Sequence, residues 1–234
     1  MFYNLYAGDA PSPHRADVAR GTEVRVGALG LPGLLVIPPG ARGLILFAHG
    51  SGSSRHSPRN NAVAAFFHDA GWATLLFDLL TEEEDDERRN TFDIPLLVSR
   101  LVEATSWIGK RTDTGGLPVG YFGGSTGAAA ALVAAATVGP DIAAVVSRGG
   151  RPDLAGDALG RVQSPTLLIV GENDPDVLVL NRKALRQLKC EKSLAVVPGA
   201  RHLFEEPGAM EEVMQLARIW YSMHLQRPHG QLNL

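Results

Sequence analysis

Residues 119–127 read Val119-Gly-Tyr-Phe-Gly-Gly-Ser-Thr-Gly127, and this segment is the strongest single indication of the fold. A short apolar run at 119–122 is followed at once by small residues and then by an alanine-rich helical stretch at 125–138. A strand that turns sharply into a helix holds its turn residue in a strained conformation, and small flanking residues avoid collisions there. The pattern therefore predicts that Ser125 lies on a tight turn above a sheet. A turn with a capping serine is the purely structural alternative.

Short apolar segments alternate with helical stretches on both sides of this turn, which predicts an α/β fold. Most strand-like segments are apolar at successive positions, as expected for a parallel sheet covered on both faces. Two weaker segments flank residues 27–33 and predict an antiparallel hairpin. The eight expected strands are 22–26, 34–37, 44–48, 73–77, 119–122, 142–147, 166–170 and 194–197. The expected helices are 60–70, 94–110, 125–138, 177–188 and 209–224.

Length and composition favour one globular domain. The chain has 234 residues, of which 45% are hydrophobic and 20% are charged, and no interdomain linker is visible. We therefore expect a single domain over 1–234, with residues 1–20 as an N-terminal extension and 227–234 as a frayed tail. The net charge of −3 gives no electrostatic reason to bind nucleic acid or a membrane surface.

The cysteine content and the start of the chain bear on its location. The single cysteine, Cys190, excludes an internal disulfide framework and a cysteine-based zinc site. The first residues lack the basic start and apolar stretch of a secretory signal, so a cytoplasmic location is expected. No cluster of residues has metal-ligand spacing, and none is expected to bind a metal.

Two other residues are placed to work with Ser125. Asp174 lies in Gly171-Glu-Asn-Asp-Pro-Asp176, directly after the strand at 166–170, and His202 directly follows the last strand. Carboxyl ends of parallel strands meet at one edge of a sheet, where ligands bind. A serine nucleophile needs a base, and the base needs an orienting acid. The order Ser125, Asp174, His202 therefore predicts a catalytic triad.

Other acids and histidines compete for these roles. Glu172 and Asp176 are alternatives to Asp174, but Asp176 is expected to cap the helix at 177–188 and Glu172 to point away. The histidines stand at positions 14, 49, 56, 68, 202, 224 and 229. Those at 14, 224 and 229 lie near the termini, His68 lies in a helix, and two belong to another loop. His202 is therefore the expected base.

That loop is Phe47-Ala-His-Gly-Ser-Gly-Ser-Ser-Arg-His-Ser-Pro58. Acyl transfer requires preorganised amide donors for the oxyanion of the tetrahedral intermediate. We expect the backbone N–H of Thr126 to be one donor and that of Ser51 the other, with Gly52 as the neighbouring alternative. His49 is expected to shape the loop. A phosphate-binding loop is the other interpretation, but the lysine of a P-loop does not follow.

These motifs resemble those of the α/β-hydrolase superfamily. The compactness of the chain and the residues of the motifs are most similar to those of its dienelactone hydrolase-like branch. The resemblance covers the loop at 47–58, the serine turn, and the segments that contain Asp174 and His202. It implies an eight-stranded, mostly parallel sheet with an antiparallel second strand, a Ser125–His202–Asp174 triad and no cofactor. Enzymes of this branch that act on dienelactone use a cysteine nucleophile, so Ser125 argues against dienelactone as the substrate.

The expected function is a serine hydrolase that cleaves small-molecule carboxylic esters. The alternatives are a non-catalytic ligand-binding module and an acyltransferase that uses another acceptor, including peroxide. The segment between strands 142–147 and 166–170 is too short for a large cap, which favours small or medium acyl groups. The acidic segment Glu82-Glu-Glu-Asp-Asp-Glu-Arg-Arg89 is expected to be a solvated loop, with a substrate-selecting patch as the alternative.

Several residues near the expected site are candidates to bind the substrate. They are Gly52, Arg55, His56, Arg148 and Arg151. The arginines that follow strand 142–147 are suited to a substrate carboxylate. A surface salt bridge to Asp153 or Asp157 is the alternative for them.

Overall fold

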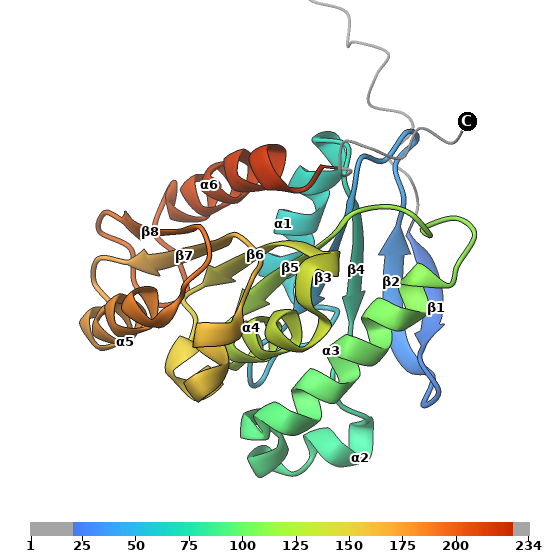
Figure 1. Cartoon of the computed structure of the whole chain (residues 1–234), viewed down its shortest axis with the longest axis horizontal. Coiled ribbons are helices and arrows are strands. Elements are labelled where there is room, and N and C mark those ends of the chain that lie inside the picture. Colours follow the sequence, from blue (N-terminus) through green and yellow to red (C-terminus); the bar gives the residue numbers. More distant parts are fainter. Residues whose placement is uncertain (1–20, 227–234) are drawn as a thin grey trace, which may run out of the picture.

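The structure is a computed structural model that describes residues 21–226. The expected N-terminal extension (1–20) and C-terminal tail (227–234) lie outside these residues. The described part forms the predicted α/β fold around one eight-stranded sheet, with strand order β1-β2-β4-β3-β5-β6-β7-β8 (Figure 1). The strands are β1 Thr22–Val26, β2 Leu31–Val36, β3 Leu44–Ala48, β4 Ala73–Phe77, β5 Val119–Gly124, β6 Ile142–Arg148, β7 Thr166–Gly171 and β8 Lys192–Val197.

Strand β2 runs antiparallel to both β1 and β4, and all the other neighbouring strands are parallel. The predicted hairpin is therefore confirmed, but β2 begins three residues earlier than expected. Val26 pairs with Leu31, and a tight turn with positive φ at Gly27 and Gly30 joins the strands. Pro32 weakens the strand pattern in the sequence because proline cannot donate a backbone hydrogen bond. In the structure its carbonyl accepts a hydrogen bond from Asp78 N–H, and the pairing of β2 with β1 and β4 keeps this residue extended.

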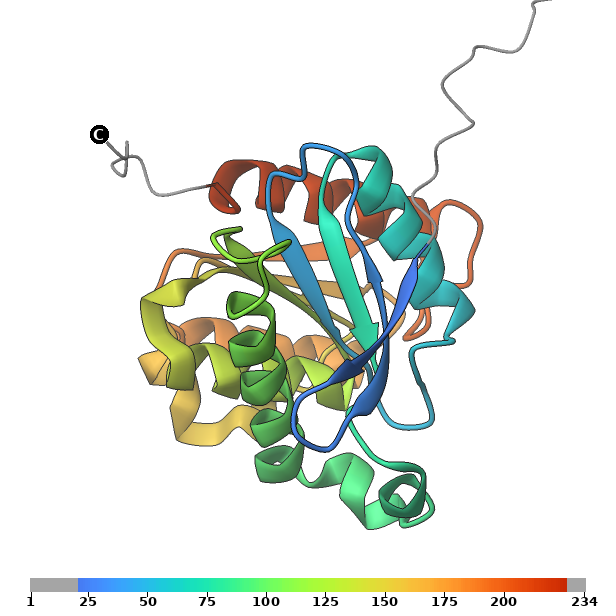
Figure 2. The same ribbon diagram turned by 90° about the vertical axis from the view of Figure 1, so that its right-hand side faces the viewer.

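Helices cover both faces of the sheet (Figures 1 and 2). One face carries α1 and α6, and the other carries α3, α4 and α5. Each face has its own apolar core, because most sheet residues are buried on both sides. The helices are α1 Pro58–Asp69, α2 Glu82–Asp85, α3 Ile94–Gly109, α4 Thr126–Val138, α5 Pro175–Gln187 and α6 Ala209–His224; the 3₁₀ segments are η2 Arg88–Phe92, η3 Gly139–Asp141 and η4 Pro152–Arg161.

The prediction of a loop for the acidic segment was wrong, because its first residues form α2. Thr81 caps this helix with its hydroxyl, which accepts from Glu84 N–H at 3.2 Å, and the Glu84 carboxylate accepts from Thr81 N–H at 3.0 Å. This reciprocal capping and the acidic first turn both favour a helix start. Glu84 also forms an ion pair with Arg100 of α3 at 2.7 Å, which fixes α2 to the body of the fold.

The junction of β5 and α4 is packed without spare room. A Cβ on Gly127 would lie 2.1 Å from the carbonyl oxygen of Ala48, and a Cβ on Gly123 would lie 2.5 Å from the Cα of Ala128. Helix α4 therefore packs backbone to backbone against β3 and β5. This close approach fixes the position of Ser125, which lies between the two glycines.

We expect Gly127→Ala to destabilise the protein by about 1–3 kcal/mol, because its methyl group would collide with the end of β3. Urea unfolding followed by circular dichroism measures this change. Gly109→Ala, at the exposed end of α3 with open space around it, is the matched control and should be neutral or slightly stabilising. Equal stability of the two variants would contradict the packing constraint.

Candidate active site

Ser125 lies on the turn between β5 and α4 with φ 50° and ψ −122°. Positive φ is strained for a residue with a side chain and persists only where surrounding contacts impose it. Here Ser125 N–H donates to the carbonyl of Arg148 at 3.4 Å, and its own carbonyl accepts from Arg151 N–H at 3.0 Å. The helix begins at Thr126, one residue later than predicted, and the Ser125 hydroxyl makes no capping hydrogen bond.

Asp174 and His202 are directly bonded. The Asp174 carboxylate lies 2.6 Å from His202 Nδ1, with side chains 15% and 40% exposed. Asp174 occupies the N-cap position of α5, yet it makes no side-chain capping bond there. Its carboxylate is thus turned toward the imidazole, which connects the loop after β7 to the loop after β8.

The other acids of this segment lie elsewhere. The prediction that Asp176 caps the helix was wrong, because α5 begins at Pro175 and Asp176 lies within its first turn. Pro is favoured at the start of a helix, so the helix includes residues that the apolar pattern left out. The Glu172 carboxylate accepts a hydrogen bond from Gly199 N–H at 2.9 Å and so braces the loop before His202.

Residues 148–151 connect the serine turn with the histidine loop. Ser125 is bonded to this segment through its backbone, as described above. From the other side, a Cβ on Gly149 would lie 3.1 Å from the carbonyl oxygen of His202 and 3.6 Å from its ring carbon Cε1. Within residues 21–226 the hydroxyl of Ser125 makes no hydrogen bond to the imidazole. Catalytic hydrogen bonds are often long before substrate binds.

The loop after β3 lies directly on the serine turn. A Cβ on Gly50 would lie 2.8 Å from the Cβ of Ser125, so only glycine fits at this contact. Gly52 has φ 67°, a left-handed conformation that favours glycine. The Ser51 hydroxyl is 2.9 Å from that of Thr91 in η2. The loop thus contacts the serine turn directly, and Ser51 and Thr126 remain the predicted oxyanion donors.

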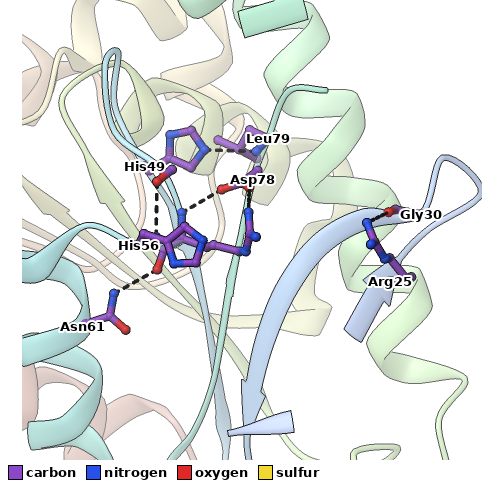
Figure 3. A network of polar contacts seen from close by, with 9 residues as sticks. Arg25, Gly30, His49, His56, Asn61, Asp78 and Leu79 are labelled. Atoms are coloured by element: carbon purple, nitrogen blue, oxygen red, sulfur yellow. Dashed lines mark hydrogen bonds and ion pairs between the residues drawn. The ribbon is translucent and has the colours of Figure 1, made fainter. Parts of the chain in front are cut away.

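His49 holds this loop to the end of β4 (Figure 3). Its Nε2 accepts a hydrogen bond from Leu79 N–H at 3.0 Å, so the ring proton is on Nδ1, which lies 3.1 Å from the Gly50 carbonyl oxygen. Burial lowers the pKa of His49, against the opposing effects of the Gly50 carbonyl and Asp78. The neutral imidazole therefore connects two backbone segments, as the sequence predicted for a loop-shaping residue.

Arg55 is paired within the protein. Its guanidinium forms an ion pair with Asp78, and its backbone N–H donates to the same carboxylate at 2.7 Å. Its carbonyl accepts from the Asn61 side chain at 2.9 Å. Arg55 thus braces the loop in this structure, and the neighbouring His56 is exposed, with its N–H donating to Ser54 Oγ.

Arg148 and Arg151 differ in their surroundings. Arg151 forms an ion pair with Asp153 at 2.8 Å, the alternative expected from the sequence. Nε and Nη1 of Arg148 are buried and have no hydrogen-bond partner. Burial, together with the nearby charge of Arg59, lowers the pKa of Arg148 to about 10.

A cavity of ≈ 290 Å³ lies beside His202 and is lined by Arg201, His202, Leu203, Glu205 and Glu206. A larger one of ≈ 570 Å³, bordered by Trp72 and Leu225, lies at the opposite edge of the sheet, away from the candidate site. Over residues 21–226, no group of three potential metal ligands occurs. None of the helices in this range is long and apolar enough to cross a membrane.

The fold and the chain are similar to solved structures. A crystal structure of dienelactone hydrolase from Anabaena variabilis ATCC 29413 is 55% identical and superposes with a TM-score of 0.85. The match covers 88% of this chain and 100% of that chain. The chain belongs to the dienelactone hydrolase-like branch of the α/β-hydrolase superfamily. Est1E from Butyrivibrio proteoclasticus is 16% identical with a TM-score of 0.73, over 88% of this chain and 98% of its own, and supports the fold alone.

Two further relatives of this α/β hydrolase come from Mycobacterium tuberculosis, strains CDC 1551 and H37Rv. Each is 57% identical over 211 residues and carries the provisional name phosphoribosyl transferase. The match covers 89% of this chain and 48% of each relative, so the chain spans about half the length of these curated relatives. No family model matches the chain.

Sequence reasoning missed several residues that position the site. Asp78 and Thr91 hold the loop after β3, as described above. Asn181 of α5 is fully buried and donates to the carbonyl of Gly150 at 3.0 Å, which fixes the segment beneath Ser125. A signal for Asn181 was present, because it is a polar residue four positions after Val177 and three before Ala184 on the apolar side of a helix.

We expect the free energy of unfolding to fall as the pH drops from about 8 to about 5, with a contribution from His49. Folding lowers the His49 pKa, so below its ordinary value of 6.5 the unfolded chain binds more protons than the folded chain. The stabilisation from neutral His49 is thus present at high pH and lost as the pH falls from about 6.5 through the lower folded value. Urea unfolding at a series of pH values measures this dependence.

His49→Gln should be less stable than the wild type at pH 8 and should lose less stability on acidification. His68, whose pKa is also lowered by burial, contributes to the same trend and is left intact in this variant. His56→Gln, in the exposed part of the same loop, is the matched control. If the stability of His49→Gln keeps the full pH dependence of the wild type, a neutral His49 does not hold the loop to the end of β4.

Proposed function

We propose that this α/β hydrolase cleaves carboxylic esters with small or medium acyl groups through Ser125, His202 and Asp174. The observation that carries the proposal is the 2.6 Å contact between Asp174 and His202 Nδ1, at the sheet edge where Ser125 occupies a strained turn. A proton held on Nδ1 by a carboxylate leaves Nε2 free to accept the proton of a nucleophile. The solved relative named dienelactone hydrolase supports ester chemistry.

In the proposed reaction, His202 removes the hydroxyl proton as Ser125 attacks the ester carbonyl carbon. Asp174 keeps the imidazole in the required tautomer and stabilises its positive charge. The oxyanion accepts hydrogen bonds from Thr126 N–H, at the positive end of the α4 dipole, and from Ser51 N–H. The protonated imidazole then gives its proton to the leaving alkoxide, and an acyl-enzyme remains. Water, activated by His202, releases the acid and restores the serine.

The same residues bear on the two alternatives, a ligand-binding module and an acyltransferase. A ligand-binding module has no use for a strained serine at the sheet edge that also carries an Asp174–His202 pair, so these features favour catalysis. An acyl acceptor other than water would use the same acyl-enzyme. Product analysis in the presence of alcohols or peroxide tests whether the acyl group passes to an acceptor other than water. A cytoplasmic location is part of the proposal, supported by the use of only one cysteine.

The name of the M. tuberculosis relatives suggests a second activity in those longer proteins. The Anabaena variabilis hydrolase is covered over its whole length by this chain, whereas the M. tuberculosis proteins are covered over 48%. We propose that this chain corresponds to a hydrolase half of those relatives and that phosphoribosyl transfer belongs to the other half. The purified chain should therefore hydrolyse esters without phosphoribosyl transferase activity.

We expect Ser125→Ala to lower turnover of a 4-nitrophenyl ester by up to about a million-fold, because no other group can form the acyl-enzyme. The wild type should show burst kinetics and covalent labelling of Ser125 by a fluorophosphonate, located by peptide mass spectrometry. Ser222→Ala, at an exposed position of α6, is the matched control. Undiminished activity and labelling in Ser125→Ala would refute this mechanism.

We expect Asp174→Asn to lower kcat by about 10⁴-fold, because the amide favours the wrong imidazole tautomer. Asp176→Asn makes the same chemical change two residues away, on the exposed first turn of α5, and should leave kcat within about threefold. Steady-state kinetics and a thermal unfolding curve for each variant separate lost catalysis from lost stability. Similar kcat values for the two variants would assign the acid to another residue.

A further inference from the structure

The turn that carries His202 contains a second residue with a strained backbone. Among residues 21–226, two residues other than glycine have positive φ, Ser125 at 50° and Phe204 at 55°. Positive φ is uncommon for any residue with a side chain and is an outlier for a bulky one. Such strain persists only where surrounding contacts impose it, and it is concentrated at functional sites. The first of these residues is the proposed nucleophile, and the second follows the proposed base by two positions.

Phe204 closes the turn around His202. Its backbone N–H donates to the carbonyl of Arg201 at 3.2 Å, so His202 and Leu203 are the central residues of a hydrogen-bonded turn. The His202 side chain is 40% exposed and Leu203 is 41% exposed, whereas Phe204 is only 2% exposed. The left-handed conformation therefore occurs where the chain passes from an exposed turn into the core.

The Phe204 ring holds this turn from its inner side. It belongs to the apolar core on the sheet face that α1 and α6 cover. A Cβ on Gly149 would lie 3.4 Å from the ring carbon Cε2 of Phe204 and 3.1 Å from the carbonyl oxygen of His202. Gly149 directly follows Arg148, whose carbonyl accepts from Ser125 N–H. The ring thus packs beside the segment to which the serine turn is bonded.

Different contacts hold the two ends of the histidine turn. Before the turn, Gly199 N–H donates to the Glu172 carboxylate, as described above, and the Ala200 carbonyl accepts from Asn173 N–H at 2.8 Å. After His202, the first buried residue is Phe204. Burial of its ring is favourable and offsets the cost of the left-handed backbone. Without the ring, an ordinary residue at this position would return to negative φ, and the turn would shift.

We propose that Phe204 is a positioning residue that holds His202 against Asp174 and within reach of Ser125. The proposal rests on the proposed ester hydrolysis for the role of His202. It adds that the left-handed conformation of residue 204, and not apolar packing alone, sets the position of the imidazole. A purely structural Phe204 would change the stability of the protein and leave the imidazole in place.

Two substitutions separate backbone conformation from packing, because both remove the ring. Glycine adopts positive φ without strain, whereas alanine does not. We expect Phe204→Ala to lower kcat for 4-nitrophenyl butyrate by about 100-fold with little change in KM, since a shift of about 1 Å in a positioned group has this effect. Phe204→Gly should stay within about tenfold of the wild type. An equal loss in both variants, or a greater loss in Phe204→Gly, would overturn the proposal.

The bond between His202 and Asp174 is also observed without turnover. A proton held between imidazole Nδ1 and a carboxylate gives a ¹H NMR resonance far downfield of the amide protons, and its loss in His202→Gln assigns it. The resonance should be present in the wild type and in Phe204→Gly, and broadened or absent in Phe204→Ala. An unchanged resonance in Phe204→Ala would show that the imidazole does not depend on residue 204.

Phe204→Leu and Phe67→Leu form a matched pair that keeps the core apolar. Both rings lie in the same core, but Phe67 is near the end of α1. Both variants should have a lower Tm. Only Phe204→Leu should lower kcat, by about tenfold, and broaden the downfield resonance, because leucine leaves the contact with Gly149 incomplete. If Phe204→Ala or Phe204→Gly does not fold, this pair decides, and equal kcat values for the two leucine variants would reject the positioning role.

The two proposals fail in different ways. If Ser125 is not labelled and no ester is cleaved, ester hydrolysis is wrong, while a downfield resonance that is lost in Phe204→Ala and kept in Phe204→Gly would still support the positioning of His202. If esters are cleaved through Ser125 and Phe204→Ala keeps the kcat and the resonance of the wild type, hydrolysis stands and the positioning role is rejected.

Discussion

The fold and the candidate site both depend on the contact between α4 and β3 at Gly127. Because a single Cβ at this position would lie 2.1 Å from the Ala48 carbonyl oxygen, the helix rests on the strand backbone itself. This contact imposes the strained conformation on Ser125, since the chain must leave β5 and enter α4 within one residue. It also places the end of β3 beside the serine, so the loop that follows begins at the site.

The remaining parts of the site are held by polar contacts between loops. His49 and Asp78 join the loop after β3 to the end of β4, and Asn181 supports the segment beneath Ser125. These contacts satisfy backbone groups that would otherwise lack partners, namely Leu79 N–H, Arg55 N–H and the Gly150 carbonyl. The proposed acyl transfer requires preorganised backbone donors, and both the braced loops and the rigid turn would help to hold such donors in place.

The sequence was sufficient to predict the sheet, the hairpin and the pairing of Asp174 with His202, because these follow from the hydrophobic pattern and from the strand-to-loop transitions. It was insufficient where partners distant in sequence decide the outcome. The ion pair of Arg55 with Asp78 and the isolation of Arg148 depend on which loops meet at the edge. Helix α2 was missed because the acidic composition suggested solvation, whereas the decisive signal was its capping residue Thr81.

The proposed nucleophile and the proposed base follow strands that have different numbers of neighbours. Strand β5, which leads to Ser125, lies between β3 and β6, whereas β8, which leads to His202, is the edge strand of the described sheet and pairs with β7. Edge segments open at a lower free energy than the centre of a sheet. On warming, the loop that carries His202 would therefore open while the turn at Ser125 stays folded. Loss of activity would then precede the cooperative unfolding of the domain.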